Sequence, residues 1–388
     1  MRRLLLPLVV IAIAAAAPRG QATQRAPASP GVTVDNWVAA ALAHRPGTTD
    51  PPLYEVARAS LTSFDVIARR LRGTLERSVP EPEARNDVLR RGALLHTDIA
   101  LLLPDRAAAA FPSADEVVVS ADGLFLDRDT GTGHWWFASW LLSLVRPHSP
   151  ADEFVTLWYR AVAAHFQNAY LFGSSGHHLK RAKRVLPRDP ILLFYEGAMR
   201  EAMASPRFQS VPITAPGATA RQIALASAGE QLQDAEHLLR EAVRYGAPPE
   251  ATVRLGRVVG ARGRHRDAVA LLEQVAIPPG DARLAYLRDL FLGTEQFALG
   301  QPEAARTSLD RASTLFPTAQ APLLAMSAIY RRTGDRQAAF DTLRRIEALP
   351  SDPDQRSDPW WDYYRSYAAD ADNQLASVRA WVDRKGGR

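Results

Sequence analysis

The sequence contains no cysteine, and only three of its 47 basic residues are lysines. Without cysteine the chain has no disulfide, no thiolate metal site and no lipid-modified cysteine after a signal segment, which excludes a bacterial lipoprotein. It also lacks a Walker loop, a dinucleotide-binding glycine set, a His-Glu-x-x-His motif and a nucleophile elbow. These absences favour a binding protein over an enzyme, and we expect neither a cofactor nor a metal.

The start of the chain has the layout of a secretory signal peptide. Two arginines precede an apolar run over residues 4–17, which is too short for a comfortable membrane span. We place the cleavage after Ala22, so that residues 1–22 are the signal peptide and residues 23–34 form a flexible leader. We therefore expect an exported protein, periplasmic or secreted, with an uncleaved membrane anchor as the alternative.

The charge of the chain is close to balanced. Loss of the signal peptide removes Arg2, Arg3 and Arg19 but no acid, which lowers the formal net charge from +5 to +2. A value this small is too mild for a nucleic-acid-binding protein, so we expect no nucleic-acid partner.

Residues 35–148 are expected to form an N-terminal helical region. A helix over about residues 86–103 is apolar on most sides, which predicts that it is buried. The stretch EVVVSADGLFLD, near residues 116–127, departs from the helical rhythm because two apolar runs flank an Asp-Gly pair. It predicts a small β-hairpin within an otherwise helical region.

A pattern of small and apolar residues recurs in the second half of the chain. Ala268, Ala305 and Ala339 occupy the same place in three successive copies, 37 and 34 residues apart. The other positions of the pattern hold Leu255, Gly256, Gly263 and Leu272 in the first copy, Leu292, Gly293, Gly300, Leu309, Ala312 and Pro317 in the second, and Gly334 and Leu343 in the third. This spacing resembles that of the tetratricopeptide repeat family. Together with the signal peptide, it suggests an exported bacterial protein that contains such repeats.

The resemblance implies an all-α solenoid of helix-turn-helix units. Weaker copies upstream extend the array, so the repeats are expected to fill residues 149–352, with an insertion at 205–220. Small residues let the two helices of a unit approach closely, and large apolar residues fill the space to the next unit. Residues 353–388 are expected to be capping helices that seal the last repeat.

The first helices of such an array line an inner groove, and a groove of this kind implies a non-catalytic scaffold or adaptor that binds a protein or peptide partner. Its lining is expected to be mixed, apolar and basic. The candidate residues are Arg160, Gln167, Asn168, Phe194, Glu201, Arg257, Leu290, Thr294, Phe297, Leu324, Arg331 and Arg332.

A glycan or nutrient-capture protein is one alternative. Trp360, Tyr364 and Tyr367 share a face in the C-terminal segment, where they would form an aromatic platform that stacks on a sugar or a peptide. Solvent exposure of Trp136 and Trp361 would favour this alternative, and burial of both would remove its main support.

A metal-assisted enzyme is the second alternative, with a site between the N-terminal region and the repeats. It would use His96, Asp98 and His134. His96 and Asp98 are two residues apart, so on a helix their side chains point about 200° apart and do not face one metal. A buried, hydrogen-bonded structural histidine is therefore the preferred interpretation of His96.

Overall fold

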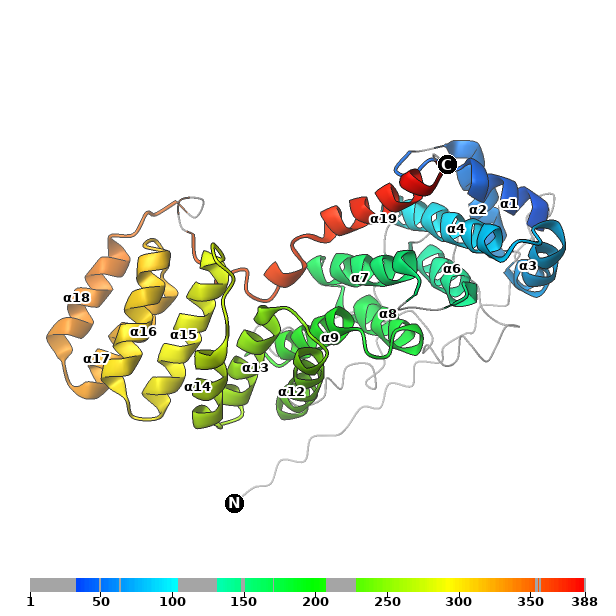
Figure 1. Cartoon of the computed structure of the whole chain (residues 1–388). Helices are drawn as coiled ribbons and strands as arrows, with labels where there is room; N and C mark the ends of the chain where they lie inside the picture. Colours follow the sequence, from blue (N-terminus) through cyan, green and yellow to red (C-terminus); the bar gives the residue numbers. More distant parts are fainter. Residues whose placement is uncertain are drawn as a thin grey trace, which may run out of the picture.

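The computed structural model describes residues 33–48, 50–62, 64–103, 131–147, 151–169, 171–206, 228–352, 355 and 357–386. All regular structure in these residues is helical, which confirms the predicted all-α class (Figure 1). None of the described helices combines the length and the apolar character needed to cross a membrane. The signal peptide, the leader up to residue 32, the hairpin near 116–127 and most of the insertion at 205–220 lie outside the described residues.

The N-terminal module is built around a buried central helix. Its helices are α1 (Val34–Ala43), α2 (Pro51–Thr62), α3 (Phe64–Ser78), α4 (Pro82–Leu102) and α6 (Gly131–Leu144). As predicted, α4 is buried along most of its length, and it packs against α1 and α6. Gly92 permits the contact with α1, because a Cβ atom there would lie 2.4 Å from the buried ring of Trp37.

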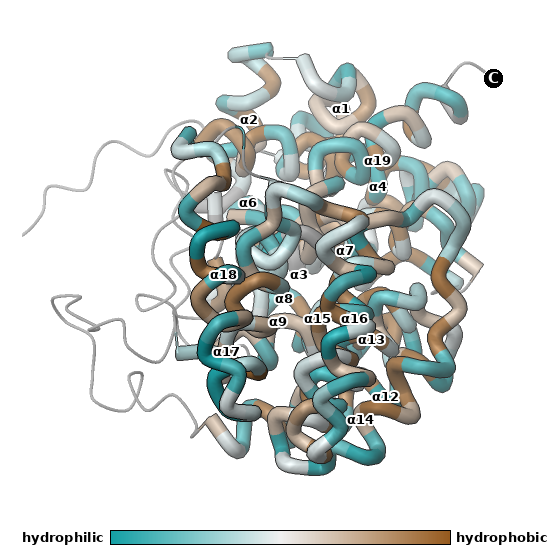
Figure 2. Tube along the Cα trace, turned by 90° about the vertical axis from the view of Figure 1, so that its left-hand side faces the viewer, coloured by the Kyte–Doolittle hydropathy of each residue, from teal (hydrophilic) through white to brown (hydrophobic). Residues whose placement is uncertain are grey.

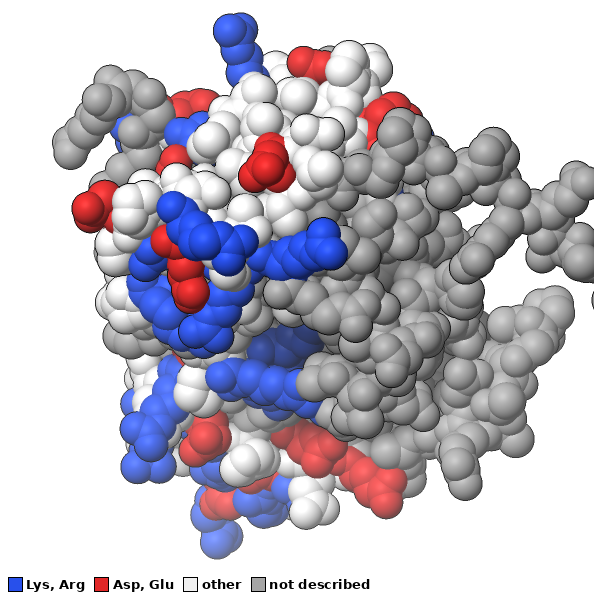
Figure 3. All heavy atoms as spheres, turned by 90° about the vertical axis from the view of Figure 1, so that its right-hand side faces the viewer, with Lys and Arg blue, Asp and Glu red and all other residues white. Residues whose placement is uncertain are grey.

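Basic and acidic side chains are interleaved on the outer end of this module (Figure 3). Arg72 pairs with Glu76 on α3, and Arg91 pairs with Asp87 on α4. Both pairs join residues four apart on one helix, which places their side chains on the same face.

Five helix pairs follow, and they form the predicted solenoid. Each first helix packs against the second helix of its own pair, and each second helix then meets the first helix of the next pair. The pairs are α7 (Glu153–Asn168) with α8 (Phe172–Val185), α9 (Pro190–Met203) with α12 (Ala228–Arg244), α13 (Pro249–Ala261) with α14 (His265–Gln274), α15 (Ala282–Ala298) with α16 (Pro302–Leu315), and α17 (Ala321–Thr333) with α18 (Arg336–Glu347).

The small residues of the repeat lie where the two helices of a pair touch. A Cβ atom at Gly256 would come within 2.7 Å of Leu272, and one at Gly293 would come within 2.7 Å of Leu309. Ala305 is fully buried at the same crossing. Hydrophobic and hydrophilic residues alternate along the array, because each helix buries one side against its neighbours (Figure 2).

The described part of the C-terminal segment touches the amino end of α17 but does not pack over α18, the last helix of the array. Residues 357–386, here called the strap, run back along the array from α17 to the N-terminal module (Figure 1). The strap contains a short 3₁₀ turn, Ser366–Ala368, and the helix α19 (Ala371–Gly386), which packs on α7 and reaches α4. This placement differs from the predicted cap on the last repeat, because beyond its contact with α17 the segment finds its partners on α9, α7 and α4.

Candidate functional site

The strap begins at the amino end of α17. One carboxylate oxygen of Asp358 accepts the backbone N–H groups of Gln320 and Ala321 at 3.0 and 2.9 Å. The other accepts the hydroxyl of Tyr286 at 2.6 Å, and burial together with this carboxylate raises the pKa of Tyr286. An acidic side chain is favourable here because it satisfies free N–H groups at the positive end of the helix dipole.

A buried ionic cluster holds the middle of the strap. The hydroxyl of Tyr363 donates to Glu201 at 2.6 Å, and the Tyr363 carbonyl accepts a guanidinium N–H of Arg254 at 2.6 Å. Arg254 and Arg257 also donate to the two oxygens of Glu201, at 3.0 and 2.8 Å. Burial alone would lower the pKa of Arg254, but the neighbouring Tyr363 and Glu250 more than offset this, and the pKa rises. The two guanidinium groups therefore stay charged, and each has hydrogen-bond partners.

The last part of the strap contacts both α7, in the first helix pair of the array, and α4, in the N-terminal module. The Tyr367 hydroxyl donates to Gln167, which is fully buried. Further along, Arg379 donates two hydrogen bonds, at 2.7 and 2.9 Å, to Asp98 on α4. Although burial would raise the pKa of Asp98, hydrogen bonds from His44, the Gly47 N–H and Arg379 lower it. These contacts join residues 281 positions apart in the sequence.

Three predicted groove residues therefore lie beneath the strap instead of lining an open groove. Gln167, Phe194 and Glu201 are buried, and Tyr367 packs edge-on against Phe194. The prediction placed them on the inner face, formed by the first helix of each pair, but it did not include the segment that covers them. They bind the chain's own C-terminal segment.

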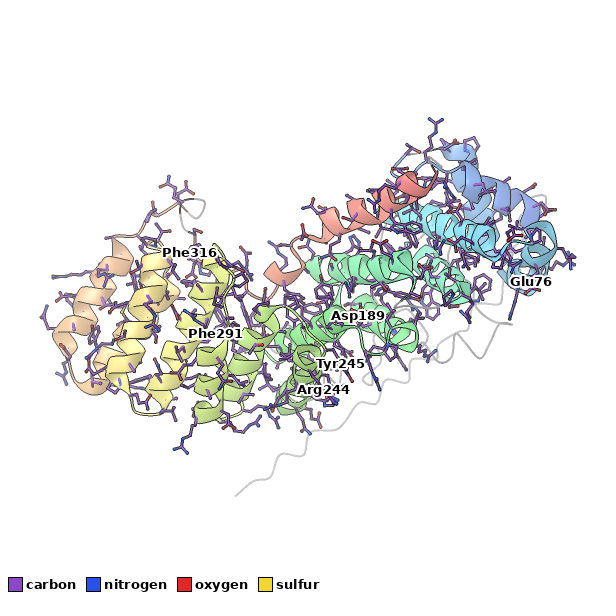
Figure 4. All side chains as sticks on the ribbon, in the orientation of Figure 1. Glu76, Asp189, Arg244, Tyr245, Phe291 and Phe316 are labelled. Atoms are coloured by element: carbon purple, nitrogen blue, oxygen red, sulfur yellow. The ribbon has the colours of Figure 1, made fainter. Side chains whose placement is uncertain are left out.

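Arg160 stands at the edge of the strap. It pairs with Asp189, the N-cap of α9, at 2.7 Å, and Asp189 marks this position in Figure 4. Arg160 also lines a cavity of about 420 Å³ between α7, α9 and the strap, together with Tyr195 and Gln374. Asn168 lies half-buried at the end of α7.

A larger cavity remains open on the inner face. It has a volume of about 540 Å³, lies between α13, α15 and α17, and is bounded by the start of the strap. Phe291, labelled in Figure 4, is one of the residues that line it from α15. We call it the open cavity; its lining residues are Arg257, Ala261, Leu290, Phe291, Thr294, Glu295, Gln320, Ala321, Leu324, Ala325, Trp360 and Trp361.

The open cavity is mainly apolar, with a few polar groups. Leu324 and Trp361, which both line it, remain 47% and 42% exposed, so two large apolar side chains are accessible to solvent at one site. Glu295 accepts a hydrogen bond from His265 at 2.6 Å, and burial raises its pKa. The charge of Arg257 is already matched by Glu201, so the cavity suits an apolar side chain flanked by hydrogen-bonding groups.

The other predicted residues lie away from the open cavity. Arg331 and Arg332 are exposed at the carboxyl end of α17, and the guanidinium of Arg332 lies 5.7 Å from the ring centre of Phe297. Of the predicted set, the structure brings Arg257, Thr294, Leu290 and Leu324 together at the cavity.

The prediction missed Phe291 and Glu295 as lining residues. Both lie on α15, on the side that carries Leu290 and Thr294. The helical periodicity of the sequence could therefore have identified them as lining residues. The placement of Trp361 beside them depends on the strap, and no local pattern indicates it.

Of the three residues of the enzyme alternative, His96 and His134 contact each other in the core, whereas Asp98 binds a different partner. A ring nitrogen of His96 lies 2.9 Å from a ring nitrogen of His134, both side chains are fully buried, and Trp37 donates to the other nitrogen of His96 at 3.2 Å. Asp98 points instead to Arg379, and its direction away from His96 agrees with their two-residue spacing on the helix. Burial lowers the pKa of His96, so its imidazole is neutral. No group of three or more potential metal ligands occurs in the described part of the chain.

No family model and no curated protein matches the chain. Among solved structures, it is similar to MamA from Desulfovibrio magneticus RS-1, with 19% identity and a TM-score of 0.39 over 51% of this chain and 96% of that one. It is also similar to PilF from Pseudomonas aeruginosa, with 10% identity and a TM-score of 0.40 over 60% of this chain and 92% of that one. YrrB, described as a TPR protein with an unusual peptide-binding site, is 12% identical with a TM-score of 0.36 over 53% and 96%. The packing of the five helix pairs, with glycine and alanine at the crossings, gives residues 153–347 the tetratricopeptide repeat fold.

Proposed function

We propose that this chain is a non-catalytic, exported scaffold or adaptor that binds a protein or peptide partner at the open cavity. The observation that carries the proposal is the cavity itself, which the strap leaves open between the first helices of three successive repeats. Concave sites lined by apolar and aromatic groups, with a few polar groups to fix orientation, are typical ligand sites. Exposed Trp361 and Leu324 are the anchors that a partner would cover.

The shape and charge of the cavity favour a peptide segment with one large apolar side chain. Leu290, Phe291 and Trp360 surround the space for that side chain, and Thr294 and Glu295 offer hydrogen bonds to the backbone next to it. A charged ligand gains less here, because Arg257 is already paired with Glu201.

Replacing Leu324 with glutamate, or Trp361 with alanine, is expected to weaken partner binding at least about tenfold, because central apolar anchors carry most of the affinity of an interface. The partner is first identified by capture from native envelope fractions with the tagged chain. Its dissociation constants for the wild-type and variant chains are then measured with purified components. Arg331→Glu with Arg332→Glu should have a smaller effect, since both residues lie outside the cavity.

Leu102→Glu is the matched control, because this leucine is 59% exposed and lies on α4, far from the open cavity. Its dissociation constant should equal that of the wild type. Equal binding by the Leu324→Glu and wild-type chains would contradict the proposed site, whichever partner is captured.

Export predicts a defined N-terminus for the mature protein. When the whole chain is produced in a bacterium, the mature protein is expected to start at Thr23, because the small residues before it suit a signal peptidase. Intact mass spectrometry of the periplasmic and culture fractions measures this directly. A chain that retains residues 1–22 in the membrane fraction would favour the anchor, and one that retains them in the cytoplasm would contradict export.

Glycan capture is a second candidate, favoured by the exposure of Trp361 beside Trp360 in the open cavity. Trp136 gives it less support, because it is half-buried and the guanidinium of Arg181 lies 3.9 Å from its ring centre. Calorimetric titration with oligosaccharides separates the two candidates. Sugar binding that disappears in Trp361→Ala would favour glycan capture over the peptide proposal.

A further inference from the structure

The last helix of the array, α18, exposes a leucine position that is buried in the two repeats before it. Leu272 of α14 and Leu309 of α16 each lie four residues after the repeat alanine, and both are 0% exposed. Leu343 of α18 holds the same position after Ala339, yet it is 43% exposed. Nothing in the described part of the chain takes the place of a sixth first helix, because the strap lies elsewhere.

Phe340 identifies the side of α18 on which such a helix would pack. Its equivalent in α16 is Arg306, whose guanidinium lies 5.4 Å from the ring centre of Tyr330 on the following helix. Its equivalent in α14 is Val269, which packs into the apolar cluster of the array. Phe340 is 52% exposed where earlier units make their contact with the next, and the guanidinium of Arg344 on the same helix lies 4.5 Å from its ring centre.

Four exposed residues form a stripe along this side of α18. Arg336, Phe340, Leu343 and Glu347 are spaced by four, three and four residues, which places them on one face of the helix. The two apolar residues lie in the middle and the two opposite charges at the ends. Within the described residues neither Arg336 nor Glu347 has a side-chain partner.

The stripe is complementary to itself. If a second α18 packs antiparallel about a two-fold axis between positions 340 and 343, Phe340 meets the partner's Leu343. In the same arrangement Arg336 meets the partner's Glu347, and symmetry repeats both contacts. A parallel arrangement would place like charges together at both ends, so the charge order selects the antiparallel one.

We propose that two copies of the chain associate through the outer face of α18, with Phe340 and Leu343 at the centre and two Arg336–Glu347 ion pairs at the rim. The second copy supplies the cover that the next repeat supplies elsewhere in the array. One helix face from each copy makes a small interface, so a micromolar, reversible dimer is expected. The proposal does not rest on the open cavity, which lies on the inner face.

A charge exchange on the mature chain tests the arrangement. Arg336→Glu alone, or Glu347→Arg alone, sets like charges against each other twice and should raise the dimer dissociation constant at least about tenfold. The double variant with both changes restores opposite pairs and should return to within about threefold of the wild type. Sedimentation velocity over a concentration series gives each constant, and circular dichroism checks that the exposed substitutions leave the fold intact.

Two further variants test the apolar centre. Phe340→Glu should abolish dimer formation, whereas Leu102→Glu, the same kind of change at an exposed leucine of the N-terminal module, should not affect it. Because the chain has no cysteine, an oxidised mixture of Phe340→Cys and Leu343→Cys chains should give more cross-linked dimer than either chain alone.

A wild-type chain that stays monomeric up to the hundred-micromolar range would overturn the proposal. The exposed face of α18 would then be a candidate contact for a helix of another protein. A dimer that survives Phe340→Glu, or a double charge variant as weak as the single variants, would overturn it as well. These results do not affect the partner-binding proposal, which is tested by the Leu324 and Trp361 variants.

Discussion

Replacing Glu201 with alanine is expected to lower the free energy of unfolding by about 3–5 kcal/mol, because it removes one member of a buried ionic cluster and leaves the others charged. The side chains of Glu201 and Arg254 are both fully buried. Without the carboxylate, Arg254 keeps Glu250 as an acidic partner and the Tyr363 carbonyl as a neutral one, and the Tyr363 hydroxyl loses its acceptor. Urea denaturation followed by circular dichroism measures the change.

Glu303→Ala is the matched control for this experiment. Glu303 also pairs with an arginine, Arg306, but its side chain is largely exposed on α16. Water already solvates both charges, so the expected loss is under about 1 kcal/mol. If the two variants lost similar stability, the Glu201 cluster would not be the anchor of the strap. Limited proteolysis adds a second readout, because cleavage within residues 357–386 should become faster in Glu201→Ala only.

The repeat was readable from the sequence because its cause is local. A glycine such as Gly293 and an alanine such as Ala305 recur wherever two neighbouring helices must approach closely, and the contact lies within one unit. Helix boundaries follow from the same short-range signals. The inner face was therefore predictable, as were four of the residues at the open cavity.

The path of the strap was not readable, because its partners are remote. Tyr363 binds Glu201 across 162 positions, and Arg379 binds Asp98 across 281. Composition indicated an aromatic segment but not where it would lie. One signal was present: Glu201 and Arg254 are charged residues on the inner sides of otherwise apolar helices, and buried charges require partners. That pattern indicates a covering element, although it does not identify which segment provides it.

The positions of His96 and His134 in the core were only partly predictable from the sequence. Helical geometry predicted that the side chains of His96 and Asp98 point in different directions, and they contact different residues. The contact between His96 and His134 joins two helices separated by residues outside the described part of the chain. The 38 positions between the two histidines follow no repeat in the sequence. Both residues could therefore be singled out as candidates, but their contact in the core could not be predicted.

Acid is expected to destabilise the array, with a contribution of about 2 kcal/mol from His178 between pH 7 and pH 5. Burial and the nearby Arg181 lower the pKa of His178 to about 3, from 6.5 in the unfolded chain. The folded state then binds fewer protons than the unfolded state between these values. The stabilisation is complete above pH 6.5 and is lost as the pH falls toward 3.

His178→Gln tests this linkage, because a glutamine amide can still donate to the Tyr159 carbonyl that His178 Nε2 contacts at 2.9 Å, yet it does not titrate. The free energy of unfolding of this variant, measured in urea at pH 7 and pH 5, should fall by about 2 kcal/mol less than that of the wild type. His237→Gln, at an exposed position of α12, is the control and should follow the wild type. An equal fall in all three chains would place the acid sensitivity elsewhere, with the buried His96 on α4 as the next residue to replace.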